Sequence, residues 1–194
     1  MILYHHPGAC SLADHIALVE AGLPYKLVSI NRDKQTEDGR DFLAINPRGY
    51  VPALELDDGT VLTENLAILA YIADQSGTLM PEDGATRWRA LEALSFMSTA
   101  IHGNLVPFFK DLPTPEKERA REALVKHFAS IAEQLGDKPF LLGDRMTIAD
   151  PYLFWSLRSA PISGVKLPER LQAYFTRMSK VPSVAKALAE EGLT

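Results

Sequence analysis

A strand, a helix and a second strand follow one another within the first thirty residues, and this unit restricts the possible folds more than any other stretch. Ile2-Leu3-Tyr4 is a short apolar strand candidate, and apolar residues at helical spacing extend from about Leu12 to Ala21. Gly22 and Pro24 then end the helix, and a second strand covers Tyr25 to Ile30. In a unit of this length the strands are parallel and the crossover is right-handed, so the chain contains a sheet covered by a helix.

The next stretch adds a hairpin, which makes the predicted sheet mixed. A short irregular helix is expected around Phe42–Ile45, after a polar segment. Strands at Ala53–Leu56 and Thr60–Leu62 are joined by Asp57-Asp58-Gly59, a strong signal for a hairpin turn. A further helix is expected over about Asn65–Gln75. The order strand, helix, strand, helix, strand, strand, helix is that of the thioredoxin fold.

Strand signals stop after this unit, and the rest of the chain is predicted to be helical. Residues Thr78–Ala85 resemble a linker, which divides the chain into an N-terminal domain over 1–77 and an all-helical domain over 87–194. A long helix is expected over about Thr86–Val106, with Trp88 on its apolar face and Pro107 at its end. Further helices are expected from Thr114-Pro115 to Gly136, after the capping box Thr147-Ile-Ala-Asp150, near Pro168–Ser179 and near Pro182–Glu191.

The composition excludes several classes of partner. The 194 residues carry 25 acidic and 20 basic side chains, interspersed along the chain, and the resulting charge of −5 leaves no basic footprint for nucleic acid. No apolar run approaches the length needed to span a bilayer, and the N-terminus lacks a signal pattern. The single cysteine excludes an internal disulfide. A protein of a reducing cytoplasm, without a membrane partner, is therefore expected.

That cysteine, Cys10, lies directly before the first predicted helix. Ser11 is interpreted as the N-cap and Asp14 as its partner in a capping box. Unpaired backbone N–H groups and the positive end of the helix dipole favour a thiolate at this place, which lowers the pKa of a cysteine. Free cysteines also serve as small buried hydrophobic residues, so the position alone leaves an inert and a reactive Cys10 equally open.

Small polar residues share one face of the long helix. Ser95, Ser98, Thr99 and His102 fall at i, i+3, i+4 and i+7, and this stripe is polar but uncharged. Such a surface indicates a cleft or a partner subunit, although a single helical histidine is more often structural than catalytic. The other histidines, His5, His6, His15 and His127, are interpreted as structural or exposed, and no metal site is expected.

Four motifs make the chain resemble the cytosolic glutathione transferases, and among them the bacterial beta class. They are Pro7-Gly8-Ala9-Cys10-Ser11-Leu12, Asn46-Pro47-x-Gly49-x-Val51-Pro52, Leu62-Thr63-Glu64, and Leu142-Gly143-Asp144 with Thr147-Ile-Ala-Asp150. The resemblance covers essentially the whole chain. It implies that glutathione is the co-substrate, that Cys10 faces its sulfur and can form a mixed disulfide with it, and that the protein is a homodimer assembled through the long helix.

The resemblance also implies a set of site residues. Cys10 and His102 are the expected catalytic residues, and glutathione is expected to contact Ser11, Lys34, Val51, Pro52, Glu64, Asn65 and Thr99. A cis Pro52 leaves the Val51 backbone free to pair with a peptide ligand. Glu64 accepts the γ-glutamyl ammonium, Asn65 meets the α-carboxylate at a helix N-terminus, and Lys34 meets the glycine carboxylate. The residues alone also permit a proline that starts a strand, a plain N-cap and a solvated lysine.

Three positions depart from the class pattern, namely His5, Asn65 and Gly103, and all of them touch the expected pocket.

The predicted function is attack of a glutathione thiolate on a small electrophile in a cleft between the domains, in a detoxification role. One alternative is a monothiol disulfide reductase or peroxidase that uses Cys10 covalently. Another is a non-catalytic binding or regulatory protein on the same fold.

Overall fold

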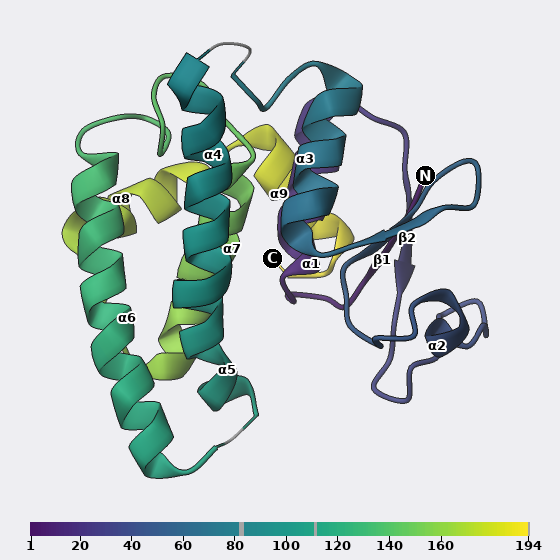
Figure 1. Cartoon of the computed structure of the whole chain (residues 1–194), viewed down its shortest axis with the longest axis horizontal. Helices are drawn as coiled ribbons and strands as arrows, with labels where there is room; N and C mark the ends of the chain where they lie inside the picture. Colours follow the sequence, from purple (N-terminus) through teal and green to yellow (C-terminus); the bar gives the residue numbers. More distant parts are fainter. Residues whose placement is uncertain (82–83, 111, 194) are drawn as a thin grey trace. The chain divides into compact units, whose positions relative to one another are not determined.

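The computed structural model of the chain describes residues 1–81, 84–110 and 112–193 (Figure 1). The chain forms two compact units. Residues 1–79 and 182–194 make up the sheet unit, and residues 80–181 make up the helical unit. No helix in the described part of the chain is both long enough and apolar enough to cross a membrane.

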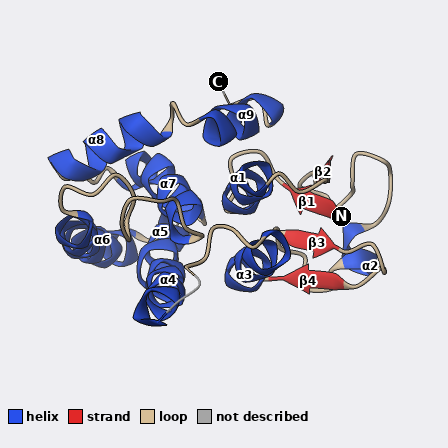
Figure 2. Cartoon of the chain, turned by 90° about the horizontal axis from the view of Figure 1, so that it is seen from above, coloured by secondary structure: helices blue, strands red, loops and turns tan. Residues whose placement is uncertain are grey.

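The sheet is mixed, as the sequence predicts. Its strands are β1 (Ile2–His5), β2 (Lys26–Ser29), β3 (Ala53–Glu55) and β4 (Val61–Thr63), in the order β2-β1-β3-β4. β1 and β2 are parallel, whereas β1 with β3 and β3 with β4 are antiparallel. Figure 2 shows this sheet with α1 (Ser11–Ala21) and α3 (Asn65–Ser76) on one side.

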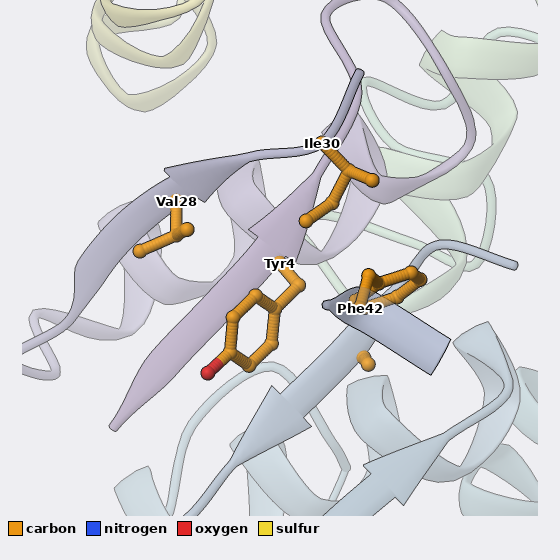
Figure 3. Close-up of a cluster of buried hydrophobic side chains, with 5 residues drawn as sticks. Tyr4, Val28, Ile30 and Phe42 are labelled. Atoms are coloured by element: carbon orange, nitrogen blue, oxygen red, sulfur yellow. The ribbon is translucent and has the colours of Figure 1, made fainter. Parts of the chain in front are cut away.

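A compact apolar cluster fixes the short helix α2 (Phe42–Ile45) to the opposite face of the sheet. Side chains alternate along a strand, so Tyr4 of β1 and Val28 of β2 point to this face and pack with Phe42 (Figure 3). The rings of Tyr4 and Phe42 are 5.8 Å apart between centroids. The neighbouring residue Leu3 is fully buried on the α1 side. The two faces of β1 are thus both covered, as the thioredoxin fold requires.

The last helix, α9 (Pro182–Glu190), belongs to the sheet unit, although it follows the helical unit in the sequence. It packs against α1, with Val184, Ala187 and Leu188 buried. The sequence-based division, residues 1–77 and 87–194, grouped this stretch with the other helices. The difference arises because a helical pattern identifies an apolar face but not the surface that covers it. The assignment of glutathione and the electrophile to the two parts stays a prediction.

The helical unit contains a continuous but irregular helical stretch in place of the predicted long helix. α4 (Gly84–Phe96) leads into a π-helical turn over Met97–His102, and α5 (Gly103–Phe109) follows. Pro107 was predicted to end the long helix, but it lies inside α5, which continues to Phe109 with Lys110 as its C-cap. Trp88, predicted to be on the apolar face, is 67% exposed. The predicted linker over 78–85 extends across residues 82–83, which lie outside the described residues.

The remaining helices follow their sequence signals. They are α6 (Thr114–Leu135), α7 (Ala149–Ser159) and α8 (Glu169–Met178), with a 3₁₀ turn over Ala160–Ser163. α6 buries one face, on which the apolar residues Leu124, Phe128, Ile131 and Leu135 recur at helical spacing. The core of the helical unit is therefore built from the residues that the helical periodicity indicates.

Asp150 organises the start of α7 and forms one half of the predicted capping box, whereas Ile148, and not Thr147, is the N-cap and no side chain caps the helix. The Asp150 Oδ2 accepts hydrogen bonds from the backbone N–H and the hydroxyl of Thr147, at 2.8 and 3.1 Å. Its Oδ1 accepts from the Leu141 N–H and from the Tyr174 hydroxyl, both at 2.8 Å. Asp150 is fully buried, and burial raises the pKa of its carboxyl although these donors oppose the rise. The side chain thus joins α7, the preceding loop and α8.

Candidate functional site

Cys10 itself occupies the N-cap position of α1, and this corrects the predicted capping box. The helix begins at Ser11, and no side chain caps it. The Ser11 hydroxyl lies 3.4 Å from the His6 backbone N–H and 3.5 Å from the His6 carbonyl, so it closes the preceding loop. The side chain of Asp14 turns toward another helix, where it accepts a hydrogen bond from Asn65. The predicted N-cap, Ser11, placed Cys10 one residue before the cap, whereas Cys10 is the cap itself and thus lies one residue closer to the helix.

The Cys10 thiol is buried and protonated. It is 9% exposed, and its Sγ donates to the Val51 carbonyl oxygen at 3.5 Å. Burial raises the pKa of the thiol to about 12, the nearby Asp14 carboxyl adds to the rise, and the backbone N–H groups of Cys10 and Ser11 lower it by less. The expectation that the helix N-terminus favours a thiolate is therefore wrong for this ligand-free chain. Cys10 is a neutral hydrogen-bond donor here.

Val51 and Pro52 lie directly against the cysteine. Their peptide bond is cis, as the resemblance implies, and the Val51 carbonyl is the acceptor for the Cys10 thiol. The loop before them is held by Asn46, whose side-chain amide donates to the Tyr50 carbonyl at 2.7 Å. The sheet unit thus brings Cys10, Val51 and Pro52 together, although they lie about forty residues apart in the sequence.

Asn65 connects α3 to α1. Its side-chain Nδ2 donates to the Cys10 carbonyl at 2.9 Å and to the Asp14 Oδ2 at 2.6 Å. Asp14 is fully buried, and burial raises its pKa well above the usual value. An amide nitrogen carries two hydrogens, so these bonds use both donors of Asn65 within the chain. The contact of Asn65 with a glutathione carboxylate stays a prediction. Its backbone N–H at the start of α3 is the group that can make this contact.

Glu64 and Lys34 adopt backbone conformations that side-chain-bearing residues rarely take. Their φ values are 72° and 61°. Such conformations cost on the order of 1–3 kcal/mol and concentrate at functional sites. The Glu64 carboxylate is exposed and lies 3.2 Å from the Arg48 guanidinium, and the Lys34 ammonium donates to the Gly49 carbonyl at 2.7 Å. Arg48 was missed in the sequence, because a single charge in a turn gives no signal of its partner.

His102 lies in an aromatic surrounding within the helical unit. Its Nδ1 is 2.9 Å from the Tyr152 hydroxyl, and its ring lies edge-on to Trp155 at 4.5 Å between centroids. Phe109 closes another side at 6.4 Å. Burial lowers the pKa of His102, so the ring is neutral at pH 7. Its position closes the π-helical turn Met97–His102, a rare element that occurs often at functional sites.

The polar stripe of the long helix is present but shorter than predicted. Ser95, Ser98 and Thr99 are exposed, and the Thr99 hydroxyl donates to the Ser95 carbonyl of its own helix at 2.9 Å. His102 is half-buried and turns toward the aromatic residues instead. The π-helical turn changes the angle between successive residues, so spacing that assumes a regular α-helix does not place His102.

Residues 1–81, 84–110 and 112–193 include no group of three His, Cys, Asp or Glu residues arranged to hold a metal ion.

Comparison with known proteins identifies relatives over the whole chain. Residues 1–74 match the family "Glutathione S-transferase, N-terminal domain", and residues 114–177 match "Glutathione S-transferase, C-terminal domain". The glutathione S-transferase GstA of Escherichia coli O157:H7 is 42% identical over 200 residues, covering all of both chains.

Solved structures agree with these sequence relatives. A bacterial beta class glutathione S-transferase of Sphingomonas chungbukensis superimposes with a TM-score of 0.93 and 41% identity, and the alignment covers both chains completely. A sphingomonad glutathione S-transferase complexed with glutathione has a TM-score of 0.91 and 41% identity, again over the full length of both. The resemblance inferred from the motifs is therefore confirmed.

Proposed function

Because the chain belongs to the glutathione S-transferase family, we propose that it conjugates glutathione to a small electrophile and that Cys10 lies at the glutathione sulfur. The observation that carries the proposal is the Cys10 thiol held against the Val51 carbonyl at the start of α1. Support comes from the sphingomonad relative, whose structure is a complex with glutathione.

In the proposed reaction the nucleophile is the glutathione sulfur. Its thiolate attacks an electrophilic carbon, a carbon–sulfur bond forms, and the leaving group departs with its electron pair. The Val51 backbone pairs with the cysteinyl backbone of glutathione, which brings the glutathione sulfur to Cys10. A neutral Cys10 thiol then donates a hydrogen bond to the thiolate, and the N-terminus of α1 adds favourable dipole interactions. Both effects stabilise the anion that must attack.

The other site residues take binding roles in this proposal. Glu64, oriented by Arg48, accepts the γ-glutamyl ammonium, and Lys34 meets the glycine carboxylate. The backbone at Asn65 receives the α-carboxylate at the start of α3. Remaining contacts are assigned to Ser11, Pro52 and Thr99. His102, neutral and held by Tyr152, serves as a hydrogen-bonding group of the catalytic site.

The wider setting follows from the same family membership. We propose a homodimer in which the exposed hydroxyls of Ser95, Ser98 and Thr99 face the partner subunit or a cleft. The expected location is the cytoplasm, the expected role is detoxification, and neither a metal nor nucleic acid takes part. Sedimentation of a monomer at micromolar concentration contradicts the dimer.

A monothiol reductase is the second candidate, because Cys10 offers a sulfur of its own. That reaction needs the Cys10 thiolate as nucleophile. A pKa of about 12 leaves about one thiolate in 10⁵ molecules at pH 7. A buried neutral thiol therefore favours conjugation, in which the attacking sulfur belongs to glutathione.

Replacement of Cys10 by alanine separates these functions. We expect Cys10→Ala to keep part of the conjugation of chlorodinitrobenzene, because Val51 and Glu64 still bind glutathione. Reduction of hydroxyethyl disulfide and the glutathione adduct seen by mass spectrometry should both disappear. Equal loss of both activities with unchanged glutathione binding means that covalent chemistry at Cys10 is the main function. Failure of the wild type to bind a glutathione column supports the non-catalytic alternative.

A further inference from the structure

A second pocket lies in the sheet unit, apart from the residues proposed to bind glutathione. Its volume is about 730 Å³, and its polar lining residues are His5, Tyr25, Ser29, Glu37, Lys186, Glu190 and Glu191. β2 is an edge strand of the sheet. α1 covers only part of the face of β2 on its side of the sheet, and α9, which packs against α1, borders the remaining part (Figure 2). Neither Cys10 nor Val51 lines the pocket. It is therefore a separate site.

The acidic side chains at the end of α9 already have hydrogen-bond partners within the sheet unit. His15 is fully buried, with its Nε2 2.8 Å from the Glu190 Oε2 and its Nδ1 3.0 Å from the Glu191 Oε1. Both ring nitrogens of His15 thus lie within hydrogen-bond distance of a carboxylate at the end of α9. Lys186 forms an ion pair with Glu190 as well. The Glu191 Oε2 accepts from the Gly8 backbone N–H at 2.9 Å, so both glutamates at the end of α9 already have partners within the sheet unit.

Glu37 is the third carboxylate of the pocket, and it has no cation beside it among the residues that the structure describes. Its backbone N–H donates to the Ser29 carbonyl at 3.0 Å, which places it at the end of β2. Its Oε2 accepts from the Ser29 hydroxyl at 2.8 Å. The pocket lining holds three glutamates and one lysine, Lys186, so negative side chains are in excess there.

His5 adds an unused hydrogen-bonding atom. It is 4% exposed and lines the pocket, and its Nδ1 has no hydrogen-bond partner within the described ranges. The Glu191 Oε1 lies 3.6 Å from this atom, beyond hydrogen-bond distance. Burial lowers the pKa of His5, so its ring is neutral and one of its nitrogens is an acceptor. A buried polar atom without a partner is costly, and a donor from a ligand removes that cost.

From these features we propose that the pocket binds a small organic amine in its protonated form. The ammonium offsets the excess of negative side chains, and its N–H groups suit the acceptors at Glu37 and His5. Leu23, Pro24 and Leu27 form an apolar wall of the same pocket, which covers a short hydrocarbon or aromatic body. The ligand class is therefore a primary amine with a compact apolar part. This site does not depend on the proposed conjugation reaction.

The test uses benzylammonium and, as a neutral analogue of the same shape, benzyl alcohol. Each is titrated into the isotopically labelled full chain in the presence of saturating glutathione, and backbone amide shifts are followed by NMR. We expect saturable shifts for benzylammonium at Leu27, Ser29 and Glu37, and at least tenfold weaker binding of the alcohol. No saturable shift at millimolar amine, or equal binding of both compounds, overturns the proposal.

A matched pair of variants tests the charge argument. Glu37→Gln removes a negative charge from an exposed side chain and should weaken benzylammonium binding about tenfold. Glu20→Gln makes the same change on the exposed end of α1, outside the pocket lining, and should leave the affinity unchanged. Equal affinities of wild type and Glu37→Gln contradict the assignment. Since neither residue belongs to the proposed glutathione site, both variants should retain the wild-type conjugation rate.

Discussion

The reactivity of Cys10 toward an alkylating reagent should be far below that of an ordinary cysteine, and its pH dependence should be shifted upward. Cys10 is the only cysteine of the chain, so the uptake of iodoacetamide reports on this thiol alone. Alkylation requires the thiolate. The burial that raises the Cys10 pKa therefore sets the expected rate in the ligand-free protein.

The size of the effect follows from the two pKa values. An ordinary cysteine has a pKa of 9.0, and burial together with Asp14 raises the pKa of Cys10 to about 12. At pH 8 the thiolate fraction is about one in ten for the first and about one in 10⁴ for the second. Alkylation of the folded protein at pH 8 should thus be about 10³ times slower than that of the same chain unfolded in urea, which is the internal control.

Limited access to a buried thiol also slows alkylation, and the pH profile separates the two causes. With a pKa of about 12, the logarithm of the rate rises with pH at unit slope to beyond pH 11. With an ordinary pKa behind a steric barrier, the rate levels off near pH 9. A plateau near pH 9, or a rate at pH 8 equal to that of the unfolded chain, refutes a protonated buried thiol.

The same shift predicts a loss of stability in alkali. The folded-state pKa of Cys10 lies above its unfolded value of 9.0, so folding favours the protonated thiol. This contribution is fully present below pH 9 and is lost as the pH rises to about 12, by about 4 kcal/mol from a shift of about three pKa units. Tyr4, whose pKa is also raised to about 12, acts in the same direction. Cys10→Ala removes only the cysteine contribution. The free energy of unfolding, measured in urea, should therefore fall less steeply with pH in the variant than in the wild type between pH 9 and about 12.

Three further predictions concern single side chains. Thr147→Ala should lower the free energy of unfolding by about 0.5–2 kcal/mol, with conjugation retained by the folded protein, because it removes a hydroxyl that donates to the Asp150 Oδ2 and accepts from the Ala149 N–H; an unchanged melting temperature with lost activity contradicts this structural role. His15→Phe should lower the free energy of unfolding in urea by roughly 3–5 kcal/mol and speed hydrogen exchange in α9, because it removes the buried contacts of His15 with Glu190 and Glu191. Lys186→Met, which breaks an exposed pair, should lower it by less than about 1 kcal/mol, and equal losses refute a stabilising role of the buried His15 contacts. Tyr152→Phe should alter the nitrogen chemical shifts of His102 by NMR, and an unchanged tautomer balance shows that the hydroxyl does not orient the ring.

Elements with local signals could be predicted from the sequence almost residue by residue. The turn Asp57-Asp58-Gly59 joins β3 to β4, and Gly22, with φ 65°, caps α1 as expected. In the predicted capping box, the Asp150 carboxylate accepts from the Thr147 N–H as its spacing implies, although the N-cap is Ile148. In each case the residues that determine the geometry lie within a few positions of one another, so the sequence contains the whole interaction.

Elements defined by distant partners could not be predicted in the same way. The pattern of α9 predicts an amphipathic helix, but nothing in residues 182–190 names α1 as its partner. The hydrogen bonds from His15 to Glu190 and Glu191 bridge more than 170 residues. The π-helical turn Met97–His102 is likewise absent from the helical periodicity, because small residues such as Ser98 and Ala100 fit both kinds of helix.

The candidate site shows why a correct position can still give the wrong chemistry. The sequence placed Cys10 at a helix N-terminus, where the dipole typically contributes 0.3–1 kcal/mol, which is less than one pKa unit. Burial raises the pKa of a thiol by up to several units, and it depends on Val51 and α3, which are distant in the sequence. Asn65 binds the buried Asp14, whose carboxyl adds to the rise of the Cys10 pKa. The larger, tertiary effect decides the protonation state, so Cys10 is a neutral thiol although it lies at a helix N-terminus.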